Sequence, residues 1–175
     1  KPNLIDGSRI QAGDVILGIP STGLHTNGFS LARAVLNDLD LNTYYEELGT
    51  TLGNALLAIH RNYVHDINQL KAAAVDIRGL AHITGGGLVD NVPRILPNNV
   101  NAIINPDTWQ TLAIFEMIQE IGAVDQAEMY RVFNMGIGMV VIIPANHLEL
   151  ALSASDDIQV IGQIESGTGA VKIEG

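Results

Sequence analysis

The sequence predicts an α/β fold, equally describable as α+β, with a mixed sheet of about six strands and flanking helices. Short apolar runs of strand length alternate along the chain with segments whose apolar residues recur at helical spacing, a pattern typical of layered α/β structures. The chain has 175 residues, of which 47% are hydrophobic and 16% are charged. This size and composition favour a single domain over residues 1–175 with a core of its own, and two small domains are the alternative.

The first strand is expected at residues 15–19, where the run VILGI is short and apolar. Pro20 ends this strand, because proline has no amide hydrogen to donate to a neighbouring strand. A helix is expected from Phe29 onward, since the apolar residues that follow fall on one face. Thr26 and Asn27 are both candidates for its N-terminal cap.

The middle of the chain alternates in the same way, after a polar stretch at 37–53 that receives no assignment. The expected elements are two helical segments within 56–70, a strand at 77–84 and a strand at 101–104. A short helix is expected after Gly87. If Asp90 caps that helix, Pro93 occupies its third position, where the helix tolerates proline.

The last third of the chain has the strongest periodicity. Apolar residues repeat at helical spacing over 106–122, which predicts a helix that carries Trp109 in the core and ends at Gly122. The further expected elements are a helix at 125–133, a strand at 139–143, a helix at 146–154 and a strand at 158–164. The glycine turn at 167–169 is then expected to lead into residues 170–173 as a terminal hairpin.

Charge and composition exclude several classes of function. The net charge is −10, from 19 acidic and 9 basic residues, which argues against a nucleic-acid partner because such proteins present a basic face to phosphates. The absence of cysteine excludes disulfides, thiolate zinc sites and cysteine nucleophiles within this chain. No apolar run approaches the roughly 18 residues of a membrane span, so no membrane partner is expected.

Three polar, glycine-rich segments stand at the ends of predicted strands, where ligands tend to bind in open α/β sheets. In the first, PSTGLHTNG at 20–28, glycines allow close approach of a ligand among hydroxyl, amide and imidazole groups. The following helix would point free amides at an anion. The alternative is a capped helix start with a hydrogen-bonded histidine, and spacing alone does not separate the two.

The second segment, HITGGG at 82–87, contains three consecutive glycines, whose conformational cost suggests a backbone that curls around a phosphate. The alternatives are a tight strand-to-helix turn and, for His82, a structural role. The segment matches neither the dinucleotide-binding nor the P-loop pattern. Arg94 and Arg131 are the best-placed cations for a phosphate.

The third segment, FNMGIG at 133–138, favours a structural role in which Gly136 and Gly138 let a strand pack closely. Elsewhere, His60, Arg61 and His65 are interpreted as a solvated helix face. The acidic pairs at 46–47 and 156–157 are interpreted as surface charge. No set of histidines and acids has the spacing of a metal site, so no metal ligands are assigned.

Three strings together resemble the phosphoribosylformylglycinamidine cyclo-ligase family, also called aminoimidazole ribonucleotide synthetases, in its C-terminal half. They are GDVILGIPSTGLHTNGFSLAR, LAHITGGGLVDNVPRILP and EMYRVFNMGIGMVV, and the resemblance runs from about Asp14 to the end of the chain. Two departures are Ile59, where the family often has proline, and Asn62, where serine is common. Neither position lies in a glycine segment.

The resemblance implies a two-domain, homodimeric, cytoplasmic ligase of de novo purine biosynthesis. In such an enzyme ATP activates the formyl oxygen of formylglycinamidine ribonucleotide, and a nitrogen closes the imidazole ring with release of ADP and phosphate. The N-terminal half would bind most of the ATP and Mg²⁺. Residues 1–175 would be the C-terminal half, which lacks that ATP-binding half, has no cofactor or metal of its own and is expected to fold without catalysing alone.

The resemblance also directs the assignment of site residues. His25 is the expected proton-handling residue, with Asn27 and Ser21 in positioning roles. The expected substrate- and phosphate-binding residues are Gly23, His82, Thr84, Gly85, Gly86, Gly87, Arg94, Asn134 and Gly136. Two alternatives remain at this point: a non-catalytic ligand-binding or docking module, and the equivalent half of a superfamily relative such as selenophosphate synthetase or thiamine monophosphate kinase.

Overall fold

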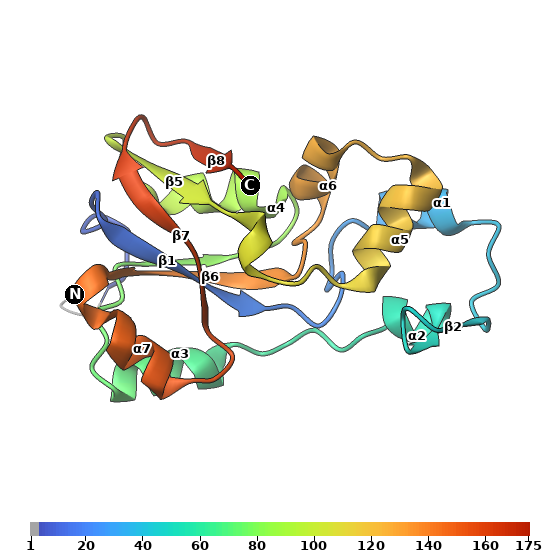
Figure 1. Cartoon of the computed structure of the whole chain (residues 1–175), viewed down its shortest axis with the longest axis horizontal. Coiled ribbons are helices and arrows are strands. Elements are labelled where there is room, and N and C mark those ends of the chain that lie inside the picture. Colours follow the sequence, from blue (N-terminus) through green and yellow to red (C-terminus); the bar gives the residue numbers. More distant parts are fainter. Residues whose placement is uncertain (1–3) are drawn as a thin grey trace.

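Six strands form one mixed, curled sheet in the order β4-β6-β1-β7-β5-β8, as the computed structural model of residues 4–175 shows (Figure 1). Their bounds are β1 Asp14–Pro20, β4 Gly79–His82, β5 Val100–Ile104, β6 Ile137–Pro144, β7 Gln159–Ser166 and β8 Val171–Ile173. The predicted fold class and all six predicted strands are confirmed. The central strands β1 and β6 are the two most apolar runs of the chain, which explains why the sequence revealed them clearly.

The terminal hairpin that the sequence predicted is wrong. Strand β5 lies between β7 and β8, pairing antiparallel with β7 and parallel with β8. The physical reason is the side chain of Asn101 on β5, whose Oδ1 accepts hydrogen bonds from the amides of Thr168 (2.8 Å) and Ala170 (3.0 Å). These bonds lead the chain around the end of β5, so the glycine turn spans one strand instead of joining two neighbours.

Helices cover both faces of the sheet (Figure 1). The first face carries α3 Val64–Ala72 and α7 Leu148–Ala154, and the second carries α1 Phe29–Leu36, α4 Gly87–Asn91, α5 Ala113–Gly122 and α6 Gln126–Val132. Neighbouring strand residues alternate between the two cores, as successive side chains in a strand must. Leu17 and Val141 lie in the core beneath α3 and α7, whereas Ile16 and Ile142 lie in the core on the other side.

The polar stretch that received no assignment contains a small ribbon of β2 Tyr44–Tyr45 and β3 Thr50–Thr51, followed by α2 Leu52–Leu56. The first of the two predicted helical segments therefore ends at Leu56. Leu57 and Ile59 lie beyond it on an irregular segment, and they are 79% and 87% exposed. Both side chains are apolar, which suggested a continuing helix, but neither is packed into the core of residues 4–175.

The predicted helix at 106–122 begins only at Ala113. A short 3₁₀ helix, η2 Pro106–Thr108, comes first, and Trp109 then runs extended so that its indole N–H donates to the carbonyl of Met135 at 2.8 Å. Trp109 is buried as predicted, but this hydrogen bond stops the helix from running through it. At the other end α5 does finish at Gly122, although the left-handed residue is the next one, Ala123.

The predicted cap of the short helix after the glycine loop is also wrong. Gly86, in a left-handed conformation, caps α4, and Asp90 lies inside the helix. Pro93 falls in the first turn of a second short helix, η1 Val92–Ile95, where its missing amide hydrogen is not needed. The remaining short element is η3 Ala145–His147, which precedes α7.

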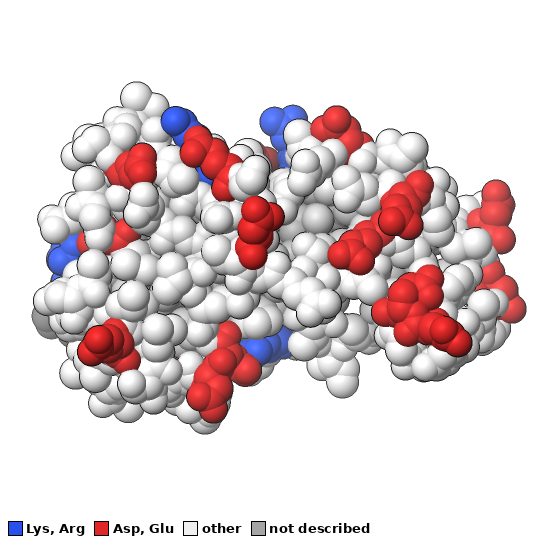
Figure 2. Space-filling model, viewed as in Figure 1, with Lys and Arg blue, Asp and Glu red and all other residues white. Residues whose placement is uncertain are grey.

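Acidic side chains outnumber basic ones on the protein, by 19 to 9. Acidic side chains are scattered over the face drawn in Figure 2, with few basic ones among them, in keeping with the net charge of −10. Among the helices of residues 4–175, none is both long enough and apolar enough to cross a bilayer.

Candidate functional site

The first and third glycine segments are joined by one buried side chain, that of Asn134. Its Oδ1 accepts hydrogen bonds from the hydroxyl of Ser21 (2.8 Å) and the amide of Gly136 (2.9 Å), and its Nδ2 donates to the carbonyl of Gly23 (2.9 Å). The amide of Ser21 also donates to the carbonyl of Gly136 at 2.8 Å. Ser21 and Asn134 are both buried, so these four predicted site residues hold the two loops together.

The second glycine segment is organised by Asn91, a residue that the sequence reasoning missed. Its Nδ2 donates to the carbonyls of Thr84 (3.3 Å), Gly85 (3.2 Å) and Gly87 (2.7 Å), while its Oδ1 accepts from the Thr84 hydroxyl (3.0 Å). Asn91 is only 4% exposed. A polar residue four positions after Gly87, on the buried face of a short helix, was the available signal.

Close packing explains two of the three consecutive glycines. Gly87 has a φ of +58°, and a Cβ there would overlap the carbonyls of Tyr130 and Phe133 at the end of α6. Gly86 has a φ of +97°, and a Cβ there would lie 2.8 Å from Oδ2 of Asp90. The carboxylate of Asp90 therefore sits against Gly86, where its charge opposes an anion.

Gly85 is the glycine that faces the first segment. It is exposed, and a Cβ built on it would lie 3.4 Å from Oδ1 of Asn27, so the two residues are neighbours. The Asn27 side chain makes no hydrogen bond within residues 4–175 and is half-buried. Arg94 lies exposed on η1 and forms no ion pair in that part of the chain, whereas Arg131 lines a separate cavity of about 620 Å³ beside α6 and β8.

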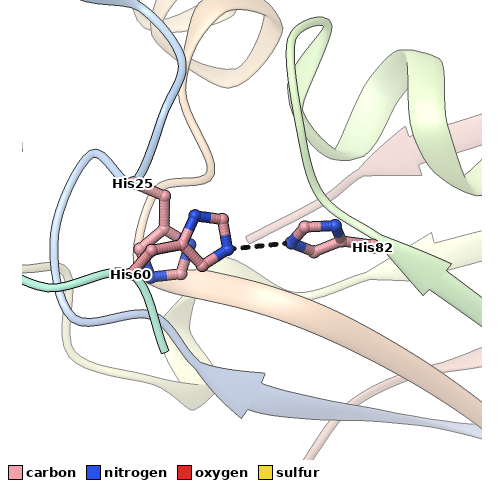
Figure 3. A group of neighbouring side chains, drawn as sticks. All are labelled: His25, His60 and His82. Atoms are coloured by element: carbon pink, nitrogen blue, oxygen red, sulfur yellow. Dashed lines mark hydrogen bonds between the residues drawn. The ribbon is translucent and has the colours of Figure 1, made fainter. Parts of the chain in front are cut away.

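Three histidines from distant parts of the chain meet beside these loops (Figure 3). His25 comes from the first glycine segment, His60 from the irregular segment before α3, and His82 from the end of β4. The rings of His25 and His60 stack with centroids 4.0 Å apart and an interplanar angle of 17°, and Nε2 of His60 lies 3.2 Å from Nε2 of His82. One ring nitrogen of each lies within 4.8 Å of the others.

This cluster corrects one expectation. His60 does not lie on a solvated helix face with His65, because residues 57–63 are not helical and cross beside the first glycine segment. The structure also brings His25, His60 and His82 to distances at which they could hold a metal ion, although their spacing along the chain is not that of a metal site. Their spacing along the chain carries no signal, because tertiary folding alone brings them together.

Hydrogen bonds on both sides of His60 hold its segment in place. The hydroxyl of Thr22 donates to the carbonyl of Ile59 (2.6 Å), and the hydroxyl of Tyr63 donates to the carbonyl of Pro20 (3.1 Å). Arg61, predicted to be solvated, instead donates to the carboxylates of Asp66 and Asp157, each at 2.7 Å. The predicted surface charge at 156–157 is thus partly engaged in anchoring this segment.

His25 is buried, with only 6% of the residue exposed, and its backbone is left-handed with a φ of 59°. Its Nε2 accepts a hydrogen bond from the amide of Thr22 at 3.1 Å, and its Nδ1 has no partner within residues 4–175. Burial, together with the neighbouring charges of His60 and His82, lowers the pKa of His25 to about 4. His25 is therefore neutral near pH 7.

His82 differs from His25 in being exposed at the end of its strand. Burial of its ring and the charge of His60 lower the pKa of His82 from its ordinary value. The close approach of strand β6 to the cluster depends on Gly138, because a Cβ there would overlap the Tyr63 hydroxyl and crowd His25. The predicted close-packing role of Gly138 is thereby explained.

A cavity of about 400 Å³ opens beside the cluster. Both His60 and His82 line it, together with apolar side chains that include Tyr63, Ile67 and Met139. A ligand in this cavity would touch two imidazoles, several apolar side chains and polar residues that include Asn68 and Lys71. Such a combination of an apolar surface and a few polar groups is typical of small-molecule sites.

Comparison with known proteins agrees with the resemblance noted in the sequence. A phosphoribosylformylglycinamidine cyclo-ligase from Lachnospira eligens is 45% identical over 179 residues, covering 99% of this chain and 52% of the relative. The cyclo-ligase of Caldanaerobacter subterraneus subsp. tengcongensis is 44% identical, covering 98% of this chain and 52% of its own length. The chain thus spans about half the length of the curated relatives it matches.

Solved structures share the fold at low sequence identity. Hydrogenase maturation protein HypE in complex with ATP superposes with a TM-score of 0.65 at 18% identity, over 96% of this chain and 49% of that one. Thiamine monophosphate kinase from Aquifex aeolicus gives 0.57 at 19%, over 98% and 52%. The family described as AIR synthase related protein, C-terminal domain, matches residues 11–174. This match spans nearly the whole chain, which therefore belongs to that family.

Proposed function

We propose that this chain is the C-terminal half of an ATP-dependent ligase that closes the imidazole ring of formylglycinamidine ribonucleotide, yielding aminoimidazole ribonucleotide, ADP and phosphate. The observation that carries the proposal is the meeting of the three glycine segments, which are scattered over more than a hundred residues, around the cluster of His25, His60 and His82. The 45% identity to a cyclo-ligase, against 19% to the kinase, favours this chemistry over that of the other superfamily members.

The N-terminal half of the enzyme is the proposed partner of this chain and the proposed binder of ATP and Mg²⁺. Leu57, Ile59 and Val64 are 79%, 87% and 63% exposed on and just after the segment that carries His60. Exposed apolar side chains gathered at one place are typical of an interface. A partner half seated there would cover them and close the cavity beside the histidines. The whole enzyme is proposed to work as a cytoplasmic homodimer.

The proposed roles divide the site residues into two groups. Ser21, Gly23, Asn134 and Gly136 hold the first and third segments together, and Thr84, Gly86 and Gly87 shape the second. These residues act by positioning the loops. Asn27 and Gly85 are proposed to contact polar groups of the ribonucleotide. The two residues are neighbours, and the amide side chain of Asn27 makes no hydrogen bond within residues 4–175. Arg94 is exposed and unpaired within residues 4–175, so it remains the proposed cation for a phosphate group.

The proton-handling role is proposed for His82 rather than for His25. His82 is exposed beside the cavity, where its Nε2 is 3.2 Å from that of His60. His25 is buried, with Nε2 accepting a hydrogen bond from the Thr22 amide. Proton transfer requires contact with the reacting group, which the position of His82 allows. His25 supports the ring of His60 by stacking against it.

The test is an ATP-dependent cyclisation assay on this chain joined to its N-terminal half, with ADP release and ring formation both measured. His82→Gln should lower kcat by about 100-fold or more, as expected when a proton-transferring side chain is lost. His65→Gln, at an exposed histidine whose side chain makes no hydrogen bond within residues 4–175, should leave kcat unchanged. The isolated chain should fold and show no turnover. Phosphorylation of thiamine monophosphate, or no cyclisation by the joined protein, would overturn the proposal.

A further inference from the structure

We propose that His25, His60 and His82 form a binding site for one divalent late transition-metal ion, for which Zn²⁺ is the probe. The site goes beyond the proposed ring closure, and it is distinct from the Mg²⁺ assigned to the other half of the enzyme. Its basis is the convergence of three imidazole rings from three separate segments at one point beside a cavity (Figure 3).

The distances within the cluster are close to those of a metal centre. Zinc binds histidine nitrogen at about 2.0–2.1 Å, which sets two ligands of a tetrahedral site roughly 3.4 Å apart. Nε2 of His60 and Nε2 of His82 are already 3.2 Å apart. A ring nitrogen of His25 lies within 4.8 Å of both, so a modest shift of the rings completes a three-histidine set.

The chemistry of the ligands selects the kind of ion. Neutral imidazole suits Zn²⁺, Cu²⁺ and Ni²⁺, whereas Mg²⁺ and Ca²⁺ prefer carboxylate, carbonyl and water oxygens. No carboxylate belongs to this group of converging side chains within residues 4–175. The site is therefore expected to bind Zn²⁺ and to ignore Mg²⁺.

The surroundings of His25 supply a second, independent observation. Its Nδ1 is the one buried side-chain nitrogen or oxygen without a partner in residues 4–175. Its Nε2 lies 3.1 Å from the hydroxyl oxygen of Thr22, whose own proton is donated to the carbonyl of Ile59. In the tautomer that carries its hydrogen on Nε2, this nitrogen no longer accepts from the Thr22 amide and instead donates to the Thr22 hydroxyl oxygen, which leaves the lone pair of Nδ1 for a metal. Metal-binding histidines are usually oriented by an outer hydrogen bond of this kind.

Binding requires the stacked rings of His25 and His60 to separate. A nitrogen lone pair lies in the plane of its ring, and these two planes are nearly parallel, at 17°. His60 is the ring that can turn, because it is only half-buried on an irregular segment anchored at its neighbours, Ile59 and Arg61. The cavity lined by His60 and His82 leaves room for water as a fourth ligand.

The test uses the 175-residue chain after treatment with EDTA and removal of the chelator. Zn²⁺ is titrated against a chromophoric chelator, and Co²⁺ is titrated separately so that the visible absorption of a tetrahedral site can be read. We expect one Zn²⁺ per chain. Loss of a ligand in His60→Ala or His82→Gln should weaken binding by at least about 100-fold, and Thr22→Val by about 10- to 100-fold, the range for an outer partner.

The matched control is His65→Ala, which also removes one of the five histidines but lies outside the cluster. It should bind Zn²⁺ as the unmodified chain does. Equal affinity in His60→Ala, His82→Gln and His65→Ala would overturn the proposal, as would no binding by the unmodified chain. Circular dichroism verifies that each variant is folded, and exposed His82 provides a test even if another variant unfolds. Because neither ATP nor the ribonucleotide is present, failure here is distinguishable from failure of the proposed enzymatic function.

Discussion

Replacing Asn134 with alanine tests whether this side chain holds the site together. The substitution removes three hydrogen bonds, to the Ser21 hydroxyl, the Gly23 carbonyl and the Gly136 amide, with lengths of 2.8–2.9 Å. At a net value of about 1 kcal/mol for each buried hydrogen bond, the free energy of unfolding should fall by about 3 kcal/mol. That loss corresponds to a change of about 100-fold or more in the unfolding equilibrium.

Urea denaturation of the 175-residue chain measures this loss, and a double-mutant cycle with Ser21→Ala resolves one of its parts. Ser21→Ala alone should cost about 1 kcal/mol, because Asn134 keeps its bonds to Gly23 and Gly136. In the Asn134→Ala background, Ser21→Ala should cost almost nothing, since its partner is gone. Asn37→Ala is the control: within residues 4–175 the side chain of this exposed asparagine bonds only to the neighbouring Asp38, and its loss should change stability by less than about 0.5 kcal/mol.

The reasoning is refuted if Asn134→Ala costs less than about 1 kcal/mol, the value of a single hydrogen bond. It is also refuted if the Ser21 and Asn134 substitutions simply add, because additivity would mean that the two side chains do not depend on each other. Either result would mean that the hydrogen bond between Ser21 and Asn134 does not hold the two loops together.

Two further predictions concern the loops around the histidines. Gly87→Ala should lower the free energy of unfolding by about 3 kcal/mol or more, because Gly87 has a left-handed backbone and the new Cβ would overlap the Tyr130 carbonyl. Gly13→Ala is the control, since Gly13 is also left-handed but has open space around it, and it should cost only about 1 kcal/mol. Urea denaturation measures both losses. Burial and the charges of His60 and His82 hold the pKa of His25 at about 4, below the ordinary histidine value of about 6.5. As pH falls below 6.5, the unfolded state binds the proton and the folded state does not, so stability should fall between pH 6.5 and 4 by up to about 1.4 kcal/mol per pH unit. His25→Asn, which tolerates the left-handed backbone, should flatten this slope in urea melts run with EDTA, and an unchanged slope would contradict the assignment.

Local apolar patterning was enough to predict the fold class and the six strands of the main sheet. β1 and β6 are short runs dominated by Val and Ile that are buried on both faces, so their identity depends on residues within the strand itself. The three glycine segments were equally visible, because turns and close approaches require glycine wherever they occur. The order of the segments along the chain also carried the family resemblance, which the match over residues 11–174 confirmed.

Errors arose where a hydrogen bond from a distant residue decided the outcome. The pairing of β8 depends on Asn101, nearly seventy positions earlier, and the start of α5 depends on a bond between Trp109 and Met135. Propensity describes the preference of a segment in isolation. A buried tertiary hydrogen bond can override that preference, because leaving such a group unpaired costs more than a few unfavourable helix or strand positions.

The sequence by itself therefore determined which segments form the six-stranded sheet, which loops are rich in glycine and which family the chain belongs to. Only the tertiary structure decided how those loops are held together. Ser21 and Asn134 bond to each other from 113 positions apart, which makes them a link between loops. His25, His60 and His82 form one cluster because three segments cross at the ends of β1 and β4. Spacing along a chain reports local geometry, whereas a site of this kind is built from long-range contacts that no local pattern encodes.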